Sequence, residues 1–213
     1  MRGVNLFVKR LIDFFGSLLG LIITFPTIII IAILIKLTSK GPVIFRQDRL
    51  GKDGRVFKII KFRTMVVNAE KIGDGLIVKS ENDNRITSIG RFLRATSLDE
   101  LPQLFNVLKG DMSLVGPRPP VPYHPYKYEN YNCFQKRRFE MRPGMTGLAQ
   151  VTVRNSVPWD DRILIDVEYI DKFSIWLDIK ILLKTILKIT RQENIYIQSE
   201  KDTALSSKTN INI

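Results

Sequence analysis

The run from Phe14 to Ile35 constrains this chain more than any other feature, because it contains no charged side chain. A helix of that length reaches ~33 Å, about the thickness of the hydrocarbon core of a bilayer. The run is too long for a secretory signal peptide, and no small-residue cleavage site follows it. Pro26 lies near its middle, where it removes a backbone donor and predicts a bend. We therefore expect a membrane-inserted helix that is interrupted at Phe25 and Pro26.

Basic residues flank this run on both sides. Lys9 and Arg10 precede it, and it is followed by Lys36, Lys40, Arg46, Arg49, Lys52 and Arg55. Because basic flanks mark the cytoplasmic side of a membrane, the pattern favours a hairpin that enters and returns to the same face. A single straight span is the alternative. We predict a re-entrant membrane hairpin over residues 1–40, a cytoplasmic catalytic domain over 41–190 and a flexible tail over 191–213.

The composition narrows the possible partners. The formal net charge of +12 over 213 residues predicts an anionic partner, which could be nucleic acid, a membrane surface or a phosphorylated substrate. Nucleic acid is disfavoured, because the basic residues flank an apolar segment and no nucleic-acid motif accompanies them. Cys133 is the only cysteine and His124 the only histidine. Any metal should therefore take oxygen ligands, which points to Mg²⁺ or a similar hard cation.

The predicted fold class is α/β, mostly helical with a small β-hairpin. We expect strands over 43–50 and 55–62 around a turn at 51–54, followed by a loop over 68–84. We expect helices over 87–94, over about 99–109, over 135–142, over 156–173 and from 174 to about 189. Ile89, Phe92 and Leu93 should point inward from the first of these helices. The second should bury Leu101, Leu104, Phe105 and Leu108 and end at Gly110.

The last predicted helix has two interpretations. Lys180, Lys184 and Lys188 share one face, and Trp176 precedes them on an otherwise apolar helix. This pattern suits an amphipathic helix at a membrane interface. Packing of the same apolar stripe on the protein core is the alternative, and periodicity does not separate the two. Before this helix, the turn at 143–147 should use its glycines for left-handed or close-approach conformations.

The adjacent carboxylates Asp99 and Glu100 are the first candidate site. The segment from Ser97 to Glu100 matches a capping box. Pro102 makes Asp99 the better cap, since the proline then falls among donors that lack an intrahelical partner anyway. A carboxylate at a helix N-terminus is also kept ionised, and beside arginines it can attack phosphorus. The spacing leaves capping and catalysis open.

Two further segments carry candidate phosphate-binding cations. Arg118 lies between prolines in the segment 116–120, and the stiff backbone would pre-organise its guanidinium for bidentate binding of phosphate. An exposed arginine in a proline-rich turn is the alternative. Lys61 and Arg63 surround one aromatic residue at the end of the second strand, where a solvated strand end is the simpler interpretation.

Long motifs then carry a resemblance to a known family. The chain is similar to the bacterial sugar transferases in the segments 61–65, 85–87, 90–94, 98–103, 106–113, 115–119 and 143–150, and in Trp159, Arg162, Asp166 and Tyr169. More narrowly, it resembles the monotopic polyprenyl-phosphate phosphoglycosyl transferases that initiate surface-glycan assembly. The resemblance covers roughly residues 5–190, in order.

The resemblance implies a reaction. A phosphosugar would pass from a UDP-sugar to undecaprenyl phosphate and release UMP, as the first membrane step of capsule, O-antigen, exopolysaccharide or glycoprotein glycan assembly. Asp99 would be the nucleophile of a ping-pong mechanism, and Glu100, together with Asp99, would hold Mg²⁺ or Mn²⁺. Phosphate or nucleotide contacts would come from Lys61, Arg63, Arg91, Arg94 and Arg118.

The resemblance also implies a location and partners. The enzyme would be monotopic in the bacterial inner membrane, with its catalytic domain on the cytoplasmic face. Anionic lipids, a second copy of the chain and downstream glycosyltransferases are its candidate partners. The family usually breaks its membrane helix at Ser-Pro, whereas this chain has Phe25 before Pro26, with Thr24 the nearest hydroxyl. It would be a minimal version without further membrane spans. A non-enzymatic, membrane-tethered module with a basic binding surface is the competing hypothesis.

Overall fold

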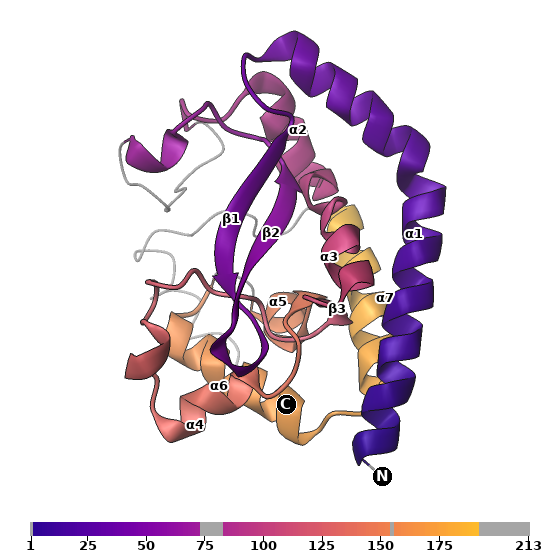
Figure 1. Cartoon of the computed structure of the whole chain (residues 1–213), viewed down its shortest axis with the longest axis vertical. Coiled ribbons are helices and arrows are strands. Elements are labelled where there is room, and N and C mark those ends of the chain that lie inside the picture. The colour runs from indigo at the N-terminus through magenta and orange to yellow at the C-terminus, as the bar shows by residue number, and fades with distance from the viewer. Residues whose placement is uncertain (1, 73–82, 154–155, 192–213) are drawn as a thin grey trace.

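The computed structural model describes residues 2–72, 83–153 and 156–191. The main elements are α1 (Arg2–Thr38), β1 (Ile44–Leu50), β2 (Val56–Phe62), α2 (Ser88–Thr96), α3 (Gln103–Lys109), β3 (Ser113–Val115), α4 (Cys133–Lys136), β4 (Gly144–Thr146), α5 (Leu148–Thr152), α6 (Trp159–Asp171) and α7 (Ile175–Arg191). Short 3-10 helices include η1 (Lys52–Gly54), η2 (Ala69–Lys71), η3 (Leu98–Glu100), η4 (Tyr128–Asn130) and η5 (Arg137–Phe139). The described chain is mostly helical with two small sheets (Figure 1), which confirms the coarse fold prediction.

The long apolar helix α1 is continuous through Pro26, and it is bent along its length instead of broken into two helices (Figure 1). Thr24 lies two residues before the proline, and its Oγ1 donates a hydrogen bond of 2.7 Å to the carbonyl of Gly20. A hydroxyl that bonds the carbonyl four residues earlier bends a helix. The predicted break is therefore a bend, and Thr24 supplies the hydroxyl beside it although Phe25 occupies the adjacent position.

Polar contacts attach the N-terminal half of α1 to the rest of the protein. Lys9 Nζ lies 2.6 Å from Asp178 Oδ2 on α7, and both side chains are buried. Arg10 donates to two carbonyls at the end of α3. Asp13 accepts hydrogen bonds from Ser113 Oγ at 3.0 Å and from the backbone N–H of the next residue. The sequence placed Lys9 and Arg10 on a membrane flank, but the structure uses both as internal anchors.

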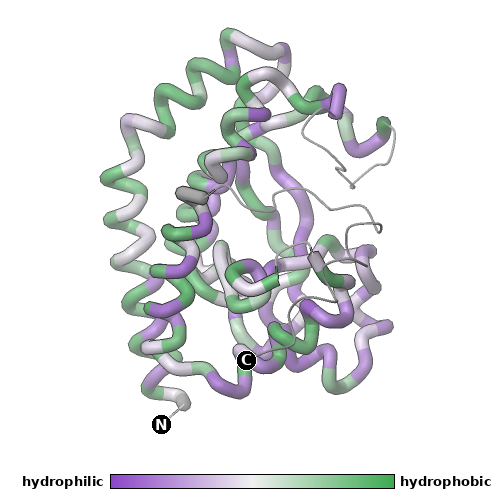
Figure 2. Tube along the Cα trace, turned by 180° about the vertical axis from the view of Figure 1, so that it is seen from behind, coloured by the Kyte–Doolittle hydropathy of each residue, from purple (hydrophilic) through white to green (hydrophobic). Residues whose placement is uncertain are grey.

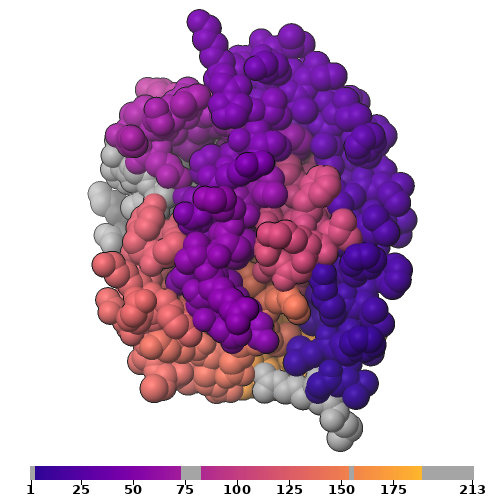
Figure 3. All heavy atoms as spheres, in the orientation of Figure 1, coloured from indigo at the N-terminus to yellow at the C-terminus, as the bar shows by residue number. Residues whose placement is uncertain are grey.

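The C-terminal half of α1 packs on the same body. Ile31 and Ile35 are buried against Phe62 of β2 and Leu93 of α2. Large apolar side chains along the rest of α1, among them Phe7, Leu19 and Ile30, are exposed, and much of the helix has the colour of hydrophobic residues (Figure 2). By length and composition α1 could cross a membrane, and 17% of its most apolar window is buried in the protein. In the space-filling view α1 forms one edge of the molecule, and the hairpin crosses the front (Figure 3).

The hairpin of β1 and β2 confirms the strand prediction. Its register pairs Ile44 with Phe62 and Leu50 with Val56, and η1 forms the turn. The second sheet was not predicted, because β3 and β4 are short and run parallel. The predicted turn at 143–147 contains β4. A Cβ on Gly144 would lie 2.1 Å from the backbone nitrogen of Gly116, which confirms the close-approach alternative for this glycine.

Several burial predictions for the helices were wrong. Phe92 of α2 is exposed, as is Phe105 of α3, whereas the polar Asn106 is buried. The reason is that α3 lies between α1 and β2, so Asn106 reaches the hairpin and bonds its backbone. The expected basic helix at 135–142 is the short α4 followed by η5, and Arg138 is buried within it. Gly110 ends α3 with φ 99°, as predicted.

The last two helices, the predicted loop and the predicted tail complete the comparison of the sequence with the structure. Ser174 Oγ accepts the backbone N–H of Leu177 and caps α7, whose Ile181 is buried while Trp176 and Leu183 are exposed. Ser156 does not cap α6, which has Pro158 at its N-cap position. The predicted loop at 68–84 contains η2, and its part from 73 to 82 lies outside the described residues. The predicted tail at 191–213 lies outside them after Arg191, the last residue of α7.

Candidate active site

A cavity of about 310 Å³ brings together segments that are far apart in the sequence. Its lining comes from the end of β2, from α2 and η3, from the loop after β3, and from α5, α6 and α7. The lining residues are Lys61, Arg94, Ser97, Asp99, Glu100, Arg118, Arg138, Met145, Thr146, Ala149, Gln150, Val151, Trp159, Arg162, Asp166, Thr185 and Lys188. The carboxylate pair and three of the five predicted phosphate-binding cations therefore share one cavity.

The carboxylate pair lies in η3 because the chain makes a sharp turn just before it. Ser97 follows α2 in the left-handed conformation, with φ 57° and ψ 15°, and its side chain makes no capping bond. Helix α3 starts only at Gln103, with Pro102 at its N-cap position. Both capping predictions for this segment were wrong, since neither Ser97 nor Asp99 caps the helix. The pair stands in a connection between two helices and faces the cavity.

Glu100 is the more acidic member of the pair. Lys61 Nζ lies 2.5 Å from Glu100 Oε1, and Arg118 Nη2 lies 3.7 Å from the same oxygen. Burial raises the pKa of the Glu100 carboxyl, but the charges of Lys61 and Arg118 outweigh burial and lower this pKa to about 2. Glu100 therefore keeps a full negative charge at neutral pH.

Asp99 behaves in the opposite way. Burial is the main cause that raises its pKa to about 6, and the adjacent charge of Glu100 adds to the increase. Lys61, Arg94 and Arg118 act against it. The prediction that Asp99 lies at a helix N-terminus, which would keep it ionised, was wrong about the position, because α3 begins only at Gln103. Asp99 remains mostly ionised at pH 7 but titrates within reach of physiological pH, as a carboxylate with raised basicity does.

The other predicted cations divide into two groups. Arg94 lines the cavity, and its Nε donates to Thr64 Oγ1 at 3.0 Å, which holds the guanidinium at the end of α2. Arg63 lies away from the cavity. Its buried guanidinium donates to the carbonyls of Ser39 and Lys40 and ties the end of α1 to the hairpin. Arg91 is exposed on α2, outside the cavity lining.

Two further cations line the cavity that the sequence pattern did not single out, Arg138 and Arg162. Arg138 is 2% exposed, and its Nη2 lies 2.6 Å from Asp166 Oδ2. The guanidinium carbons of Arg138 and Arg162 lie 5.7 and 5.2 Å from the ring centre of Trp159. A run of adjacent basic residues normally indicates a solvated face, so the burial of Arg138 had no local signal. Of these residues, Trp159, Arg162 and Asp166 had entered only through the family resemblance.

The carboxylates suit a hard cation of the Mg²⁺ type. Mg²⁺ in phosphate-handling sites takes one or two carboxylates and completes its shell with water and substrate oxygens. Asp99 and Glu100 provide such a pair beside cations that would face the phosphates. Within the described residues no group of three or more His, Cys, Asp or Glu side chains could hold a metal ion. A metal here would therefore depend on substrate oxygens and water for most of its ligands.

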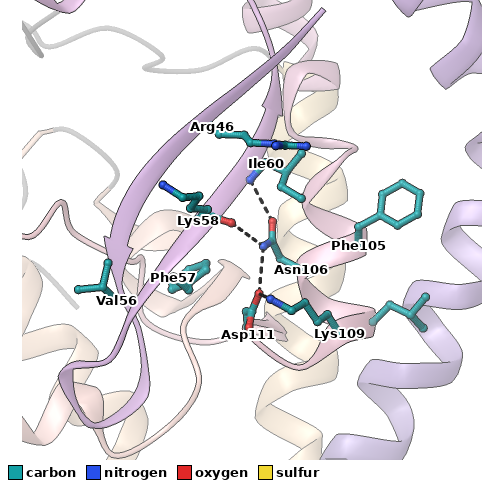
Figure 4. Close-up of a pocket in the computed structure, with 10 residues that line it drawn as sticks. Arg46, Val56, Phe57, Lys58, Ile60, Phe105, Asn106, Lys109 and Asp111 are labelled. Atoms are coloured by element: carbon teal, nitrogen blue, oxygen red, sulfur yellow. Dashed lines mark hydrogen bonds and ion pairs between the residues drawn. The ribbon is translucent and has the colours of Figure 1, made fainter.

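A second hollow of about 620 Å³ lies between the hairpin and α3 (Figure 4). Asn106 closes its floor by donating to the carbonyl of Lys58 at 2.8 Å and accepting the backbone N–H of Ile60 at 3.0 Å. Lys109 pairs with Asp111 at its rim. None of the predicted site residues is among those that line this hollow.

The cavity combines two carboxylates of unequal pKa, one of them ion-paired, with lysine and arginine side chains. In a comparison with protein families, the family described as "Bacterial sugar transferase" matches residues 4–192. The chain belongs to the bacterial sugar transferase family.

Relatives of known description are also named as sugar or sugar-phosphate transferases. The chain is 47% identical over 192 residues to the galactosyl transferase CpsE of Streptococcus agalactiae, with 85% of this chain covered and 42% of the relative. It is 46% identical over 193 residues to a Klebsiella pneumoniae UDP-glucose:undecaprenyl-phosphate glucose-1-phosphate transferase, with 88% and 41% covered. A protein of that same description from Caulobacter vibrioides is 42% identical, with 88% and 72% covered. The chain thus spans about two fifths of the length of the first two relatives.

Proposed function

We propose that this chain transfers a sugar phosphate from a UDP-sugar to undecaprenyl phosphate, giving undecaprenyl-diphosphate-sugar and UMP. The observation that carries the proposal is the cavity in which Asp99 and Glu100 lie among Lys61, Arg94 and Arg118. The names of the relatives support it, because several describe sugar-1-phosphate transfer to undecaprenyl phosphate. The reaction would begin the assembly of a surface or protein-linked glycan.

The mechanism we propose has two displacements at one phosphorus atom. An oxygen of Asp99 attacks the phosphorus that carries the sugar, the bond from that phosphorus to the UMP oxygen breaks, and UMP leaves with the electron pair. An oxygen of undecaprenyl phosphate then attacks the same phosphorus, and the bond to Asp99 breaks to restore the carboxylate. The raised pKa of Asp99 favours this role, because a more basic carboxylate is a better nucleophile and is still mostly ionised at pH 7.

The cations of the cavity would stabilise the charge that develops during both steps. Lys61 and Arg118 already face a carboxylate, and Arg94 is held in place by Thr64. Positive groups fixed before the reaction stabilise a phosphoryl transition state without reorganisation. We infer that Asp99 and Glu100 would also hold Mg²⁺ or Mn²⁺, which would neutralise charge on the diphosphate when bound.

The activity test is release of UMP in the presence of undecaprenyl phosphate, Mg²⁺ and a panel of UDP-sugars. UDP-glucose and UDP-galactose come first, because relatives are named for these donors. Asp99→Asn should abolish turnover, whereas Asp48→Asn, which removes an exposed carboxylate on β1, should not. Undiminished UMP release by Asp99→Asn would refute the assigned nucleophile. A membrane-tethered binding module would release no UMP with any donor.

We infer that α1 enters the cytoplasmic leaflet of the bacterial inner membrane and returns to the same face. The support is that both halves of α1 pack on one body, through Lys9 at one end and Ile35 at the other. A straight span would separate these ends by a bilayer. Exposed apolar residues on α7, among them Trp176 and Leu183, would add an interfacial contact with anionic lipid.

Cysteine labelling tests this topology. Val4 and Lys40 are exposed near the two ends of α1, and the native Cys133 is exposed and has to be replaced by serine first. Single cysteines at positions 4 and 40 should both react with a membrane-impermeant reagent from the cytoplasmic side only. Labelling from opposite sides would establish a straight span and contradict the inference.

A further inference from the structure

Hydrogen bonds to its backbone carbonyls hold the loop that carries Arg118. Four consecutive carbonyls, from residues 117 to 120, each accept a hydrogen bond from another part of the chain. The donors are the backbone N–H of Gly144 to residue 117 at 3.0 Å, the side chain of Arg138 to residue 118 at 2.9 Å, the side chain of Arg49 to residue 119 at 3.0 Å and the backbone N–H of Leu50 to residue 120 at 2.9 Å.

Two of these four donors are arginine side chains, and taking a charged guanidinium out of water has a desolvation cost that its hydrogen bonds have to offset. Arg138 is buried, and its Nη2 bridges the Arg118 carbonyl and the carboxylate of Asp166. Arg49 Nη1 donates to the carbonyl of Pro119, while its Nη2 donates to Gln47 Oε1 at 2.5 Å. A guanidinium presents several donors in a rigid fork, so each arginine fixes a loop carbonyl relative to a second group.

Arg118 itself depends on this support. Its side chain is 44% exposed, and its ion-pair contact with Glu100 is long, at 3.7 Å. An exposed arginine with a weak contact keeps much of its rotamer freedom. Its backbone is therefore the part that the fold can fix, and the prolines on either side restrict φ without setting where the loop lies in space. The four hydrogen bonds set that position.

We propose that Arg49 and Arg138 are positioning residues, which hold the backbone of Arg118 so that its guanidinium meets the phosphates of the bound nucleotide sugar. This proposal rests on the proposed function. Arg138 also lines the cavity, whereas Arg49 contacts the loop through the carbonyl of Pro119 and is not among the residues that line the cavity. Arg49 therefore offers the cleaner test, since direct contact with a ligand in the cavity does not enter its effect.

The test is a double-mutant cycle between Arg49 and Arg118, measured on the full chain in detergent. Arg49→Met and Arg118→Ala are made singly and together, and UDP affinity and kcat/KM for the UDP-sugar are measured for each. In the presence of Arg118, we expect Arg49→Met to weaken both by about tenfold, as expected for loss of one hydrogen bond to a charged group. In the Arg118→Ala background the same change should cost less than about twofold, because coupled residues are not additive.

Two further variants separate positioning from a general effect on folding. Arg49→Lys keeps the charge without the fork and should recover only part of the loss. Arg85 is another buried arginine, whose Nη1 donates to the carbonyl of Ile72 and which is not among the residues that line the cavity. Any loss caused by Arg85→Lys should be the same in both Arg118 backgrounds.

The outcomes are distinct. An equal loss for Arg49→Met with and without Arg118 would overturn the proposal, because it would mean that Arg49 supports the fold or binds the ligand independently. Full recovery in Arg49→Lys would also overturn it, since charge alone would then suffice. Failure of the wild-type chain to release UMP would instead refute the proposed function. UDP affinity would still report on the Arg49–Arg118 coupling in that case.

Discussion

Replacing Glu100 with glutamine should move the acid limb of the pH–rate profile to lower pH. In the proposed mechanism Asp99 must be ionised to attack phosphorus, and burial raises its pKa to about 6. In the wild-type chain, kcat/KM should therefore fall about tenfold per pH unit below that value. Burial causes most of the increase in this pKa, and the charge of Glu100 contributes further to it. Removing that charge leaves burial as the cause that raises the pKa of Asp99. Lys61, no longer paired with Glu100, then lowers this pKa more strongly, together with Arg94 and Arg118.

The size of the shift follows from the adjacent charges. Two unit charges ~6 Å apart at an effective dielectric constant of ~20 interact by ~3 kcal/mol, which corresponds to roughly two pKa units. The Glu100 side chain is 23% exposed, so solvent screens part of this interaction, and we expect about half of it, a downward shift of about one pH unit in Glu100→Gln. Lys61→Met should move the acid limb in the opposite direction, to higher pH, because the charge of Lys61 lowers the pKa of Asp99.

The assay is initial-rate UMP release at low UDP-sugar concentration, from about pH 5 to 8, where kcat/KM reports the pKa of the free enzyme. Both variants will lose overall activity, so the midpoint of the limb is compared and not its height. An acid limb that stays in place in Glu100→Gln, or moves in the same direction in both variants, would refute the assignment of Asp99 as the titrating nucleophile.

Three further predictions concern stability, each measured by thermal or denaturant unfolding in detergent. Lys9→Met should cost about 3–5 kcal/mol by leaving Asp178 buried and unpaired, and a smaller loss when Asp178 is also made apolar would confirm the pairing. Asn106→Leu should cost about 2–4 kcal/mol, because two backbone groups of β2 lose their partners; a neutral result would show that water replaces the amide. Gly144→Ala should destabilise the β3–β4 pair, because its Cβ would meet the backbone of Gly116, and unchanged stability would contradict the close packing.

Local rules account for the parts of the fold that the sequence predicted well. The hairpin follows from alternating strands around Gly51 and Gly54, and α2 starts at Thr87, whose side chain accepts the N–H of Gly90. Gly110 ends α3 through a left-handed conformation that favours glycine. Each of these signals is contained within a few neighbouring residues, so tertiary contacts did not override it.

The failures have two other causes, a local turn that the pattern did not predict and contacts between residues far apart in the sequence. Asp99 looked like a helix cap because the pattern around it is that of a cap, but Ser97 turns the chain and α3 begins later. The run of basic residues predicted a solvated Arg138, but its side chain is buried and pairs with Asp166, 28 residues away in the sequence. The grouping of Asp99 with Arg118 came from the family resemblance, because spacing alone did not separate their catalytic use from local structural roles.

The contacts of α1 link the proposed membrane element to the proposed phosphate site. Asp13 bonds the start of β3 through Ser113, and the loop that carries Arg118 follows β3 directly. Arg10 holds the end of α3, which starts just after Glu100. One face of α1 therefore contacts the elements that flank both halves of the site, while its other face is apolar and exposed. Because buried polar contacts make this attachment, the depth of α1 in the bilayer would also set the height of Arg118 and Glu100 above it, where a lipid phosphate has to arrive.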